Sequence, residues 1–561
     1  MEYYVVSPNI YNDGDNYAEQ MYLERIAAVG WSENAPKGNT FKKIQIGDVI
    51  IVALRSYWEW YYYYAGIVVG DVQNPQLGKL AKNLSPIIKL DTCQLNFEKW
   101  SANGSNQIPS PQRIKKEENK SIIKKLNLLF YMKKFESILL NNHNLILTGA
   151  PGTGKTYLAK QIAQQMIFGS VKEEKDFTEA EKQQFKEQCG FVQFHPSYDY
   201  TDFVEGLRPI QDDNGNVGFE RKDGVFKEFC KKAEKNWIDS KKSIDVLQKE
   251  FYNKELIDSF LSNAINEETI YKTKTGTEFN IADFDDDIIS IKILRNKIRG
   301  NIDIDININK HKIFKLLEND VSLNNVRDIK QFFGYTNTQH RDSYIFTICN
   351  EIRNLPKVNS VQIDPIVCKN FVFIIDEINR GEISKIFGEL FFSIDPGYRG
   401  KNGKVKTQYQ NLIEVGDEFY DGFFVPENVY IIGTMNDIDR SVESMDFAFR
   451  RRFAFKEIKA DDNIEMLEEL GELKDEAIER MKRLNAEISK IEGLSSAYHI
   501  GAAYFLKLKN YAGDADGGFE NLWNNHLEGL LREYLRGSLN IEESIAKLEA
   551  AYNNESPENN G

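Results

Sequence analysis

The chain of 561 residues is 41% hydrophobic and carries a formal net charge of −14. This length is sufficient for three or four domains with buried cores. The acidic balance argues against a protein that binds nucleic acid over its whole surface, because repulsion from phosphates would dominate, so any nucleic-acid contact must be local.

Disulfide, zinc and membrane patterns are absent from the sequence. The five cysteines lie far apart without a C-x-x-C pair, and no histidine has a second ligand at metal-binding spacing. There is no apolar run of about 18 residues, and the chain begins without a basic segment followed by an apolar one. We therefore expect a cytoplasmic protein without a membrane segment.

Residues 1–95 predict a small β-rich domain. Tyr3–Ser7, Ile44–Val52 and Tyr61–Val69 have strand patterns, and Ala18–Ala28 has a helical one. A G-D turn before one strand and an A-G-I-V strand after it resemble the PUA-like group that includes EVE and YTH domains. The resemblance implies a nucleic-acid reader.

Aromatic side chains of this region are candidates for the walls of a pocket that holds a flipped base. They would equally suit core and strand-face packing, because half-buried strands are rich in aromatics, and the sequence leaves both interpretations open. The candidates are Trp31, Tyr57, Trp58, Trp60 and Tyr61.

Residues 96–120, with Pro109, Pro111 and a run of Lys and Glu, predict a linker, and the core begins near Ser121. The apolar run Asn144–Thr148 then leads into Gly149-Ala-Pro-Gly-Thr-Gly-Lys-Thr156, which fits the pattern G-x-x-x-x-G-K-[ST]. A strand, a glycine-rich loop and a helix in this order direct backbone N–H groups at a bound phosphate.

The chemistry of a phosphate loop assigns a role to each residue type in it. Gly149 and Gly154 allow the backbone to wrap the phosphates, Lys155 is the charge partner of the β- and γ-phosphates, and Thr156 is a Mg²⁺ ligand. The predicted nucleotide-binding set is Gly149, Pro151, Gly152, Thr153, Gly154, Lys155, Thr156 and Tyr157.

More than 150 residues separate the block Phe194–Pro209 from the next apolar strand, which is far more than a crossover needs. Residues 236–360 predict a small α+β insertion, with a helix at Ile244–Asn266 and strands between Phe279 and Ile293. Arg295, Lys297 and Arg299 form a basic turn that suits either a solvated loop or a contact with DNA or a partner.

The run Phe371–Ile375 has the apolar, β-branched character of a central parallel strand and ends in Asp376-Glu377. This is a Walker B pattern. Asp376 would hold Mg²⁺, and Glu377 would polarise the water that attacks the γ-phosphate.

A third apolar strand, Val429–Gly433, leads to Asn436, which fits the sensor 1 residue of AAA+ enzymes. Asp446-Phe-Ala-Phe-Arg450-Arg451-Arg452-Phe453 then places three guanidinium groups before another strand. Such arginines commonly reach the nucleotide of a neighbouring subunit as fingers, although a basic run also suits a solvated face.

Helical periodicity in Asn463–Leu470, Leu473–Ile491 and Asn521–Arg536 predicts a helical lid over residues 459–545. Residues 546–561 are expected to form a disordered tail, because Asn553–Gly561 is polar. The α/β core is thus expected to span 121–458.

The string Met435-Asn436 to Asp439-Arg440-Ser441 follows the sensor 1 position, and further blocks lie at 149–157, 194–209, 375–389, 446–453 and 500–505. Through these blocks the chain resembles the McrB family, the AAA+ motor subunits of modification-dependent McrBC restriction systems. The string after sensor 1 is the most discriminating of them. The block 500–505 has Ala502 and Ala503 where relatives carry a polar residue, which puts a lid contact through these side chains in question.

The resemblance implies an AAA+ P-loop NTPase with a helical lid and an α+β insertion, active with GTP, or ATP, and Mg²⁺. It implies a homo-hexameric ring, a McrC-like partner that carries the nuclease, and modified DNA bound through the N-terminal domain. It assigns catalytic roles to Glu377, Asn436, Asp439, Arg450 and Arg451. The sequence has no N-K-x-D guanine-reading motif, so the base preference rests on the resemblance.

Two other classes of function remain open. An ATP-dependent remodeller of the MoxR kind would hydrolyse ATP in preference and bind no DNA through residues 1–95. A self-contained nuclease lacks a credible strand with an Asp followed by Glu-x-Lys, because Glu382-Ile-Ser-Lys385 follows the Walker B strand as a helix.

Overall fold

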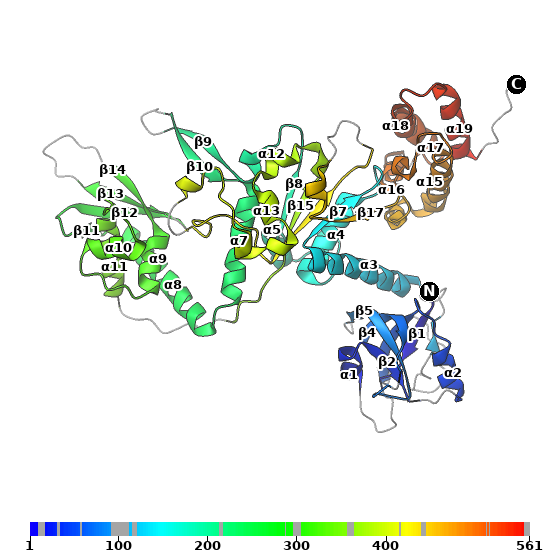
Figure 1. Cartoon of the computed structure of the whole chain (residues 1–561), viewed down its shortest axis with the longest axis horizontal. Helices are drawn as coiled ribbons and strands as arrows, with labels where there is room; N and C mark the ends of the chain where they lie inside the picture. Colours follow the sequence, from blue (N-terminus) through cyan, green and yellow to red (C-terminus); the bar gives the residue numbers. More distant parts are fainter. Residues whose placement is uncertain are drawn as a thin grey trace. The chain divides into compact units, whose positions relative to one another are not determined.

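The structure is a computed structural model that describes residues 1–8, 17–30, 34–56, 59–73, 75–90, 112–114, 120–211, 217–285, 288–294, 304–355, 364–413, 417–438, 445–511, 513–514 and 516–554. Residues 1–185 and 454–561 form one compact unit, and residues 186–453 form a second. Figure 1 labels the elements of both units. The predicted domain boundaries do not coincide with this division, and the assignment of domains stays a prediction.

A six-stranded sheet forms the N-terminal part of the first unit, in the order β2-β5-β4-β3-β1-β6. Strands β1 and β3 are parallel and the other neighbours are antiparallel. The elements are β1 (Tyr3–Val6), α1 (Ala18–Leu23), β2 (Ile26–Val29), α2 (Pro36–Lys42), β3 (Val49–Ser56), β4 (Glu59–Asp71), β5 (Leu80–Lys89) and β6 (Gln112–Arg113).

Both faces of this sheet are buried, because successive residues of a strand point to opposite faces. In β3, Ile50 and Val52 pack in the core that includes residues of α1 and α2, whereas Val49 and Ile51 pack in the core that includes α3 (Lys120–Asn142). The predicted β-rich N-terminal part is confirmed.

The predicted helix at residues 18–28 is wrong in its second half. It ends at Leu23, Arg25 turns the chain with a positive φ of 54°, and Ile26–Val29 is a fully buried strand paired with β5. The Tyr64 hydroxyl donates to the Ile26 carbonyl at 2.5 Å, which fixes this strand in the core.

The predicted linker is also interrupted, because Arg113 pairs with Tyr4 and Ile114 is buried with α3. Among the predicted pocket aromatics, Trp31, Tyr57 and Trp58 lie outside the described residues, as do the side chains of Trp60 and Tyr61.

The rest of the first unit contains the parallel strands β7 (Asn144–Thr148) and β17 (Ala454–Glu457), with helix α4 (Lys155–Phe168) following β7. A helical lid follows β17, which confirms the predicted lid. Its elements are a 3₁₀ segment (Ile464–Leu473), α15 (Lys474–Ile488), α16 (Ala502–Phe505), α17 (Phe519–Leu522), a π-helical turn (Trp523–Leu527), α18 (Glu528–Tyr534) and α19 (Ile541–Asn553).

Helix α19 contradicts the prediction that residues 546–561 are disordered. Ile545, Leu548 and Tyr552 recur at helical spacing and are buried, and α19 packs against α15. The prediction extended the polar end, Asn553–Gly561, over residues that carry an apolar helix face. Residues 555–561 lie outside the described residues.

The core of the second unit is a parallel sheet in which β15 (Phe371–Asp376) lies between β8 (Cys189–Gln193) and β16 (Val429–Thr434). Strands β15 and β16 are buried at every position, as the apolar runs predict. The other elements are α5 (Glu179–Gln188), which enters from the first unit, α6 (Tyr200–Phe203), β9 (Glu205–Gln211), β10 (Val217–Asp223), α7 (Val225–Ser240), α12 (Ile383–Phe387), α13 (Leu390–Ser393) and α14 (Phe447–Arg450).

The predicted insertion is a four-stranded antiparallel sheet covered by helices, drawn in green in Figure 1. Its inward residues, among them Phe279, Ile291 and Ile308, form a core of their own with the helices. The elements are α8 (Ile244–Asn266), β11 (Ile270–Lys272), β12 (Glu278–Phe284), β13 (Ile288–Leu294), β14 (Ile304–Asn309), α9 (Lys310–Glu318), α10 (Val326–Phe333) and α11 (Asp342–Arg353). The basic turn of Arg295, Lys297 and Arg299 lies outside the described residues.

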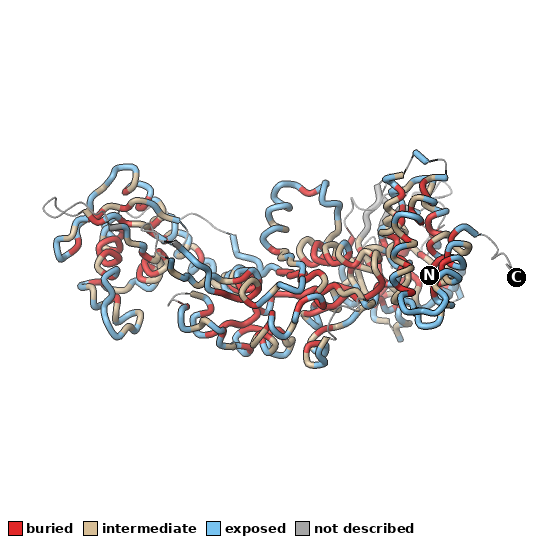
Figure 2. Tube along the Cα trace, turned by 90° about the horizontal axis from the view of Figure 1, so that it is seen from above, coloured by how far each residue is buried: buried red, intermediate tan, exposed pale blue. Residues whose placement is uncertain are grey.

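Figure 2 shows the buried residues along the strands and along the helix faces that cover them, with the loops exposed. None of the helices in the described ranges is both long enough and apolar enough to cross a bilayer.

Replacement of Leu548 by Ala tests the packing of α19. Leu548 is fully buried, so Leu548→Ala should lower the free energy of local unfolding of the lid helices α15 and α19 by about 2–5 kcal/mol. Hydrogen exchange of the amides in α15 and α19 measures this change. Glu549→Ala, on the exposed face of the same helix, is the control and should change the free energy by less than about 0.5 kcal/mol. Equal protection in both variants would contradict the packing of α19.

Candidate functional site

The glycine-rich loop joins the buried strand β7 to helix α4. Gly149, Gly152 and Gly154 have φ of 141°, 75° and 80°, which are conformations that side chains disfavour. Gly154 is the residue before the first turn of α4, so the loop ends where the free N–H groups of the helix begin. The sequence therefore builds an anion-binding turn at this point.

Lys155 is buried and lies within the curve of this loop. Its Nζ donates to the carbonyls of Gly149 and Ala150, at 3.0 and 2.8 Å. The Thr153 hydroxyl also donates to the Ala150 carbonyl, at 3.1 Å, which holds the loop closed. An ammonium group is thus fixed among backbone groups where an anion would bind.

Two other predicted residues lie in the first turn of α4. Thr156 is half-buried, and Tyr157 is 46% exposed. The hydroxyl of Thr156 is an oxygen donor of the kind that Mg²⁺ prefers.

The lid contacts this loop through backbone groups. The N–H of Ala503 donates to the Gly152 carbonyl at 2.9 Å, and the N–H of Gly501 donates to the Pro151 carbonyl at 3.2 Å. These backbone contacts do not depend on a polar side chain at position 502 or 503.

A side chain of the lid that the sequence did not single out also holds the loop. Asn463 Nδ2 donates to the Thr153 carbonyl at 2.7 Å. Asn485 supports the same region, since its side chain accepts from the N–H of Ile500 at 2.7 Å and donates to the carbonyl of Ile500 at 3.0 Å. No sequence motif marks these amides, because their partners are backbone atoms far along the chain.

Close packing between the loop and the lid also requires glycine at two positions. A Cβ on Gly501 would lie 2.2 Å from the carbonyl carbon of Gly152, and a Cβ on Gly152 would lie 2.5 Å from the Tyr504 ring. The loop and the lid thus approach each other within van der Waals contact at positions where only glycine fits.

The second unit brings together the residues that follow β15 and β16. The parallel register aligns Ile375 with Gly433, so Asp376 and Thr434 are the next neighbours. The Thr434 hydroxyl donates to Asp376 Oδ1 at 2.6 Å and accepts from the N–H of Glu377 at 3.2 Å. Thr434 therefore positions both acidic residues, a role that the sequence analysis missed.

Glu377 is held from both sides of its carboxylate. Asn436 Nδ2 donates to Glu377 Oε1 at 2.7 Å, and Arg380 Nε lies 3.4 Å from Oε2. Glu377 also has a positive φ of 51°, which costs about 1–3 kcal/mol in a non-glycine residue and is typical of functional sites. The two residues predicted as base and sensor are thus in direct contact.

Asp376 is the oxygen donor that the sequence assigns to magnesium, and the described residues contain no group of three or more acidic, histidine or cysteine side chains that could hold a metal ion. Asp376 is a buried carboxylate, and hard oxygen donors are the ligands that Mg²⁺ requires. Asp439 lies outside the described residues.

The three consecutive arginines differ in their surroundings. Arg452 folds inward, where Nε lies 3.6 Å from Asp395 Oδ2 and the guanidinium lies over the Phe391 ring. Arg450 and Arg451 are exposed at the end of α14, and no described residue forms an ion pair with Arg451. Arg452 is therefore a structural residue, and Arg451 is available to a second molecule.

The block Phe194–Pro209 anchors the β9–β10 hairpin on the core. Glu205 is fully buried and accepts from Lys227 Nζ at 2.6 Å. Burial raises the pKa of its carboxyl, but bonds from Lys227 and Thr407 outweigh this and lower the pKa below its usual value. The Tyr200 hydroxyl, in the same block, donates to Glu389 Oε1 at 2.5 Å.

Comparison with known proteins gives two family matches. The AAA domain (dynein-related subfamily) matches residues 325–453, and the McrB alpha-helical lid domain matches residues 476–541.

Two curated relatives come from restriction systems. The chain is 27% identical to the type IV methyl-directed restriction enzyme EcoKMcrB subunit of Escherichia coli K12 over 370 residues, which is 64% of this chain and 47% of that protein. It is 32% identical to the type II restriction enzyme BsuMI component YdiS of Bacillus subtilis 168 over 93 residues, which is 16% of this chain and 26% of that protein. The chain thus spans half or less of the length of these relatives.

The chain thus combines an AAA domain with a McrB-type alpha-helical lid, and it is similar to a McrB subunit over 64% of its length.

Proposed function

We propose that the chain is the GTP-preferring AAA+ motor of a modification-dependent restriction complex. In this proposal it forms a cytoplasmic hexamer, binds modified DNA through its N-terminal domain, and drives a McrC-like nuclease partner. The nuclease activity belongs to the partner.

The glycine-rich loop supports triphosphate binding. Lys155 is fixed within the loop by two carbonyl oxygens, so its charge is in place before an anion arrives. The free N–H groups at the start of α4 add further donors. We assign nucleotide binding to Gly149, Pro151, Gly152, Thr153, Gly154, Lys155, Thr156 and Tyr157.

The hydrogen bonds that join Asn436 to Glu377 and Thr434 to Asp376 are the single observation that carries turnover. Glu377 would accept a proton from the attacking water, and the Asn436 amide would keep its carboxylate oriented. On the family resemblance, Thr156 and Asp376 are assigned to Mg²⁺, which would neutralise charge on the phosphates. Asp439 keeps its predicted catalytic role on the family resemblance alone.

Exposed residues at the end of α14 support a contact between subunits. Phe447 is 86% exposed, and Arg450 and Arg451 lie on the same short helix and its end. An apolar side chain beside a cationic one suits an interface in which the arginine reaches a phosphate.

A MoxR-like remodeller remains the alternative, because an AAA domain serves both classes. The McrB-type lid favours the restriction function.

Nucleotide turnover with modified DNA tests the proposal. The purified chain should hydrolyse GTP faster than ATP, and addition of methylated or hydroxymethylated duplex should change the rate more than unmodified duplex does. Glu377→Gln is the control and should bind nucleotide without turnover. A preference for ATP together with indifference to DNA would favour the remodeller.

Thr434→Val tests the residue that positions both carboxylates. Valine preserves the shape but removes the hydroxyl, so the turnover rate should fall by about 10–100-fold while nucleotide binding remains. Thr434→Ser keeps the hydroxyl and should retain most of the rate. Steady-state hydrolysis and calorimetric nucleotide binding measure the two effects, and equal rates in both variants would show that the hydroxyl is dispensable.

Arg451→Ala tests the arginine finger. Nucleotide binding should be unchanged, and turnover in the assembled protein should fall by about 10³-fold. Mixing Arg451→Ala subunits with Lys155→Ala subunits should restore part of the rate, because one variant supplies the finger and the other supplies the nucleotide. Arg452→Ala should instead lower the melting temperature. A mixture that stays inactive would refute action between subunits.

A further inference from the structure

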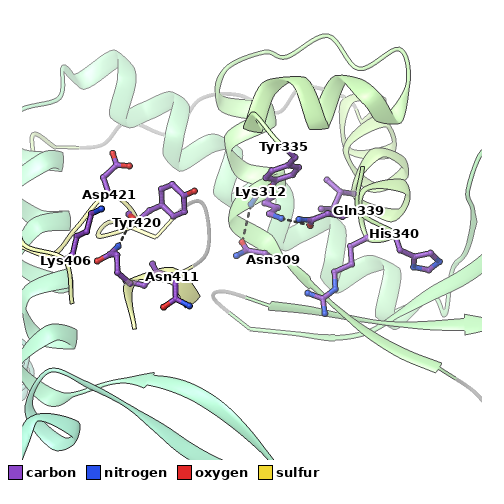
Figure 3. Close-up of a pocket in the computed structure, with 13 residues that line it drawn as sticks. Asn309, Lys312, Tyr335, Gln339, His340, Lys406, Asn411, Tyr420 and Asp421 are labelled. Carbon is purple, nitrogen blue, oxygen red and sulfur yellow. Dashed lines mark hydrogen bonds between the residues drawn. The ribbon is translucent and has the colours of Figure 1, made fainter. Parts of the chain in front are cut away.

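A polar pocket of about 880 Å³ lies within the second unit, outside the residues assigned to nucleotide chemistry. One wall belongs to the insertion, at the start of α9 and the segment before α11. The other wall consists of residues from two described segments that precede β16 in the chain, 406–413 and 420–421. Figure 3 shows Lys312 and Tyr335 on the first wall and Lys406 and Tyr420 on the second.

The charge of the pocket is opposite to that of the chain. Lys312, Arg341 and Lys406 contribute positive charge from both walls, whereas Asp421 is the acidic residue among the described residues of the lining. Asp421 itself lies 3.8 Å from Lys404 outside the pocket. In a chain of net charge −14, this local excess of cations attracts anions.

Two of these cations are exposed and available. Arg341 and Lys406 are exposed, and within the described ranges neither forms an ion pair with an acidic residue. They lie on opposite walls, so an anionic chain between the walls would meet a cation on each side.

Lys312 is fixed at the base of the insertion wall. The residue is only 9% exposed, its Nζ donates to Gln339 Oε1 at 3.3 Å, and it lies 5.0 Å from the centre of the Tyr335 ring. The N–H of Gln339 in turn donates to the buried Asp342 carboxylate at 2.7 Å. The wall is therefore built from interlocked side chains.

The second wall is also fixed. Gln410 Nε2 donates to the carbonyls of Phe419 and Tyr420, at 2.9 and 2.6 Å, which joins the two described segments of this wall. Val405 pairs with Phe423 beside it. Tyr420 is 45% exposed and projects from this wall.

The geometry points to the binding of a single strand of nucleic acid, with phosphates held by Arg341, Lys406 and Lys312 and a base stacked on the exposed ring of Tyr420. The ring of Tyr335 lies between Lys312 and Phe333 and helps to build the wall. An exposed aromatic ring among cations is a feature that proteins use for single strands, because every base has a face that stacks. An acidic peptide would use the cations and leave the Tyr420 ring without a role. This site is distinct from the N-terminal reader and does not require nucleotide turnover.

Fluorescence anisotropy with a labelled oligothymidylate of about 16 nucleotides tests the site on the full chain without added GTP. Thymine carries no modification, so the proposed reader gives the probe no specific advantage. Binding should weaken with salt, and an unlabelled duplex, mononucleotides and poly-glutamate should compete poorly. Absence of binding, or equal competition by any of these, would overturn the inference.

Charge and stacking are separated by three variants. Arg341→Glu and Lys406→Glu should each weaken binding about tenfold or more and reduce the slope of log K against log salt by about 0.7 per lost contact. Tyr420→Ala should weaken binding about fivefold or more with the slope unchanged. All three residues are exposed, so the fold should tolerate the changes.

Matched controls place the same charge change outside the pocket. Arg327→Glu changes an exposed side chain of α10, and Lys401→Glu changes an exposed side chain of the turn Gly400–Gly403 before the second wall. Both should bind as the wild type does. If the controls and the pocket variants lost affinity for the oligonucleotide equally, the effect would be one of overall charge, and the site would be overturned. Unchanged affinity in all of the pocket variants would also overturn the site. GTP hydrolysis is measured in parallel, so failure of the motor proposal is seen separately.

Discussion

The direct contact between the phosphate loop and the lid is the constraint on which the first unit depends. Carbonyl oxygens of Pro151 and Gly152 accept from the N–H groups of Gly501 and Ala503. The atoms approach so closely that a Cβ on Gly501 would overlap the loop backbone. Any displacement of the lid must therefore break these bonds or move the loop that would hold the phosphates, which gives the lid a mechanical connection to the nucleotide.

In the second unit, a single hydroxyl group positions the acidic residues of the candidate site. Four polar residues, Asp376, Glu377, Thr434 and Asn436, stand at or just after the carboxyl ends of two adjacent buried strands, and the Thr434 hydroxyl contacts both acidic residues. Because β15 and β16 are buried at every position, their register cannot slip without exposing apolar residues. The hydrophobic core thus determines the distance between the Glu377 carboxylate and the Asn436 amide.

The sequence predicts those parts of the site that depend on local pattern. The glycine loop, the acidic pair after Phe371–Ile375 and the helix Ile244–Asn266 were found because spacing and periodicity act over neighbouring residues. Thr434 and Asn463 were missed because their partners are distant in the chain. The strand Ile26–Val29 was taken for helix because two alanines carry no clear periodicity, and burial against β5 decided the outcome.

Sequence pattern also could not assign separate roles to the arginines 450 to 452. Three identical side chains in a row give no basis for a choice, but the structure separates Arg452, which is committed to Asp395 and Phe391, from the exposed Arg451.

The pocket beside the insertion is connected to the candidate site through two strands. In the chain, the insertion leads into the amino end of β15, and the residues of the second wall lead into the amino end of β16. Glu377 and Asn436 follow the opposite ends of these strands, so two rigid, fully buried strands are the covalent connection between the pocket and the catalytic residues.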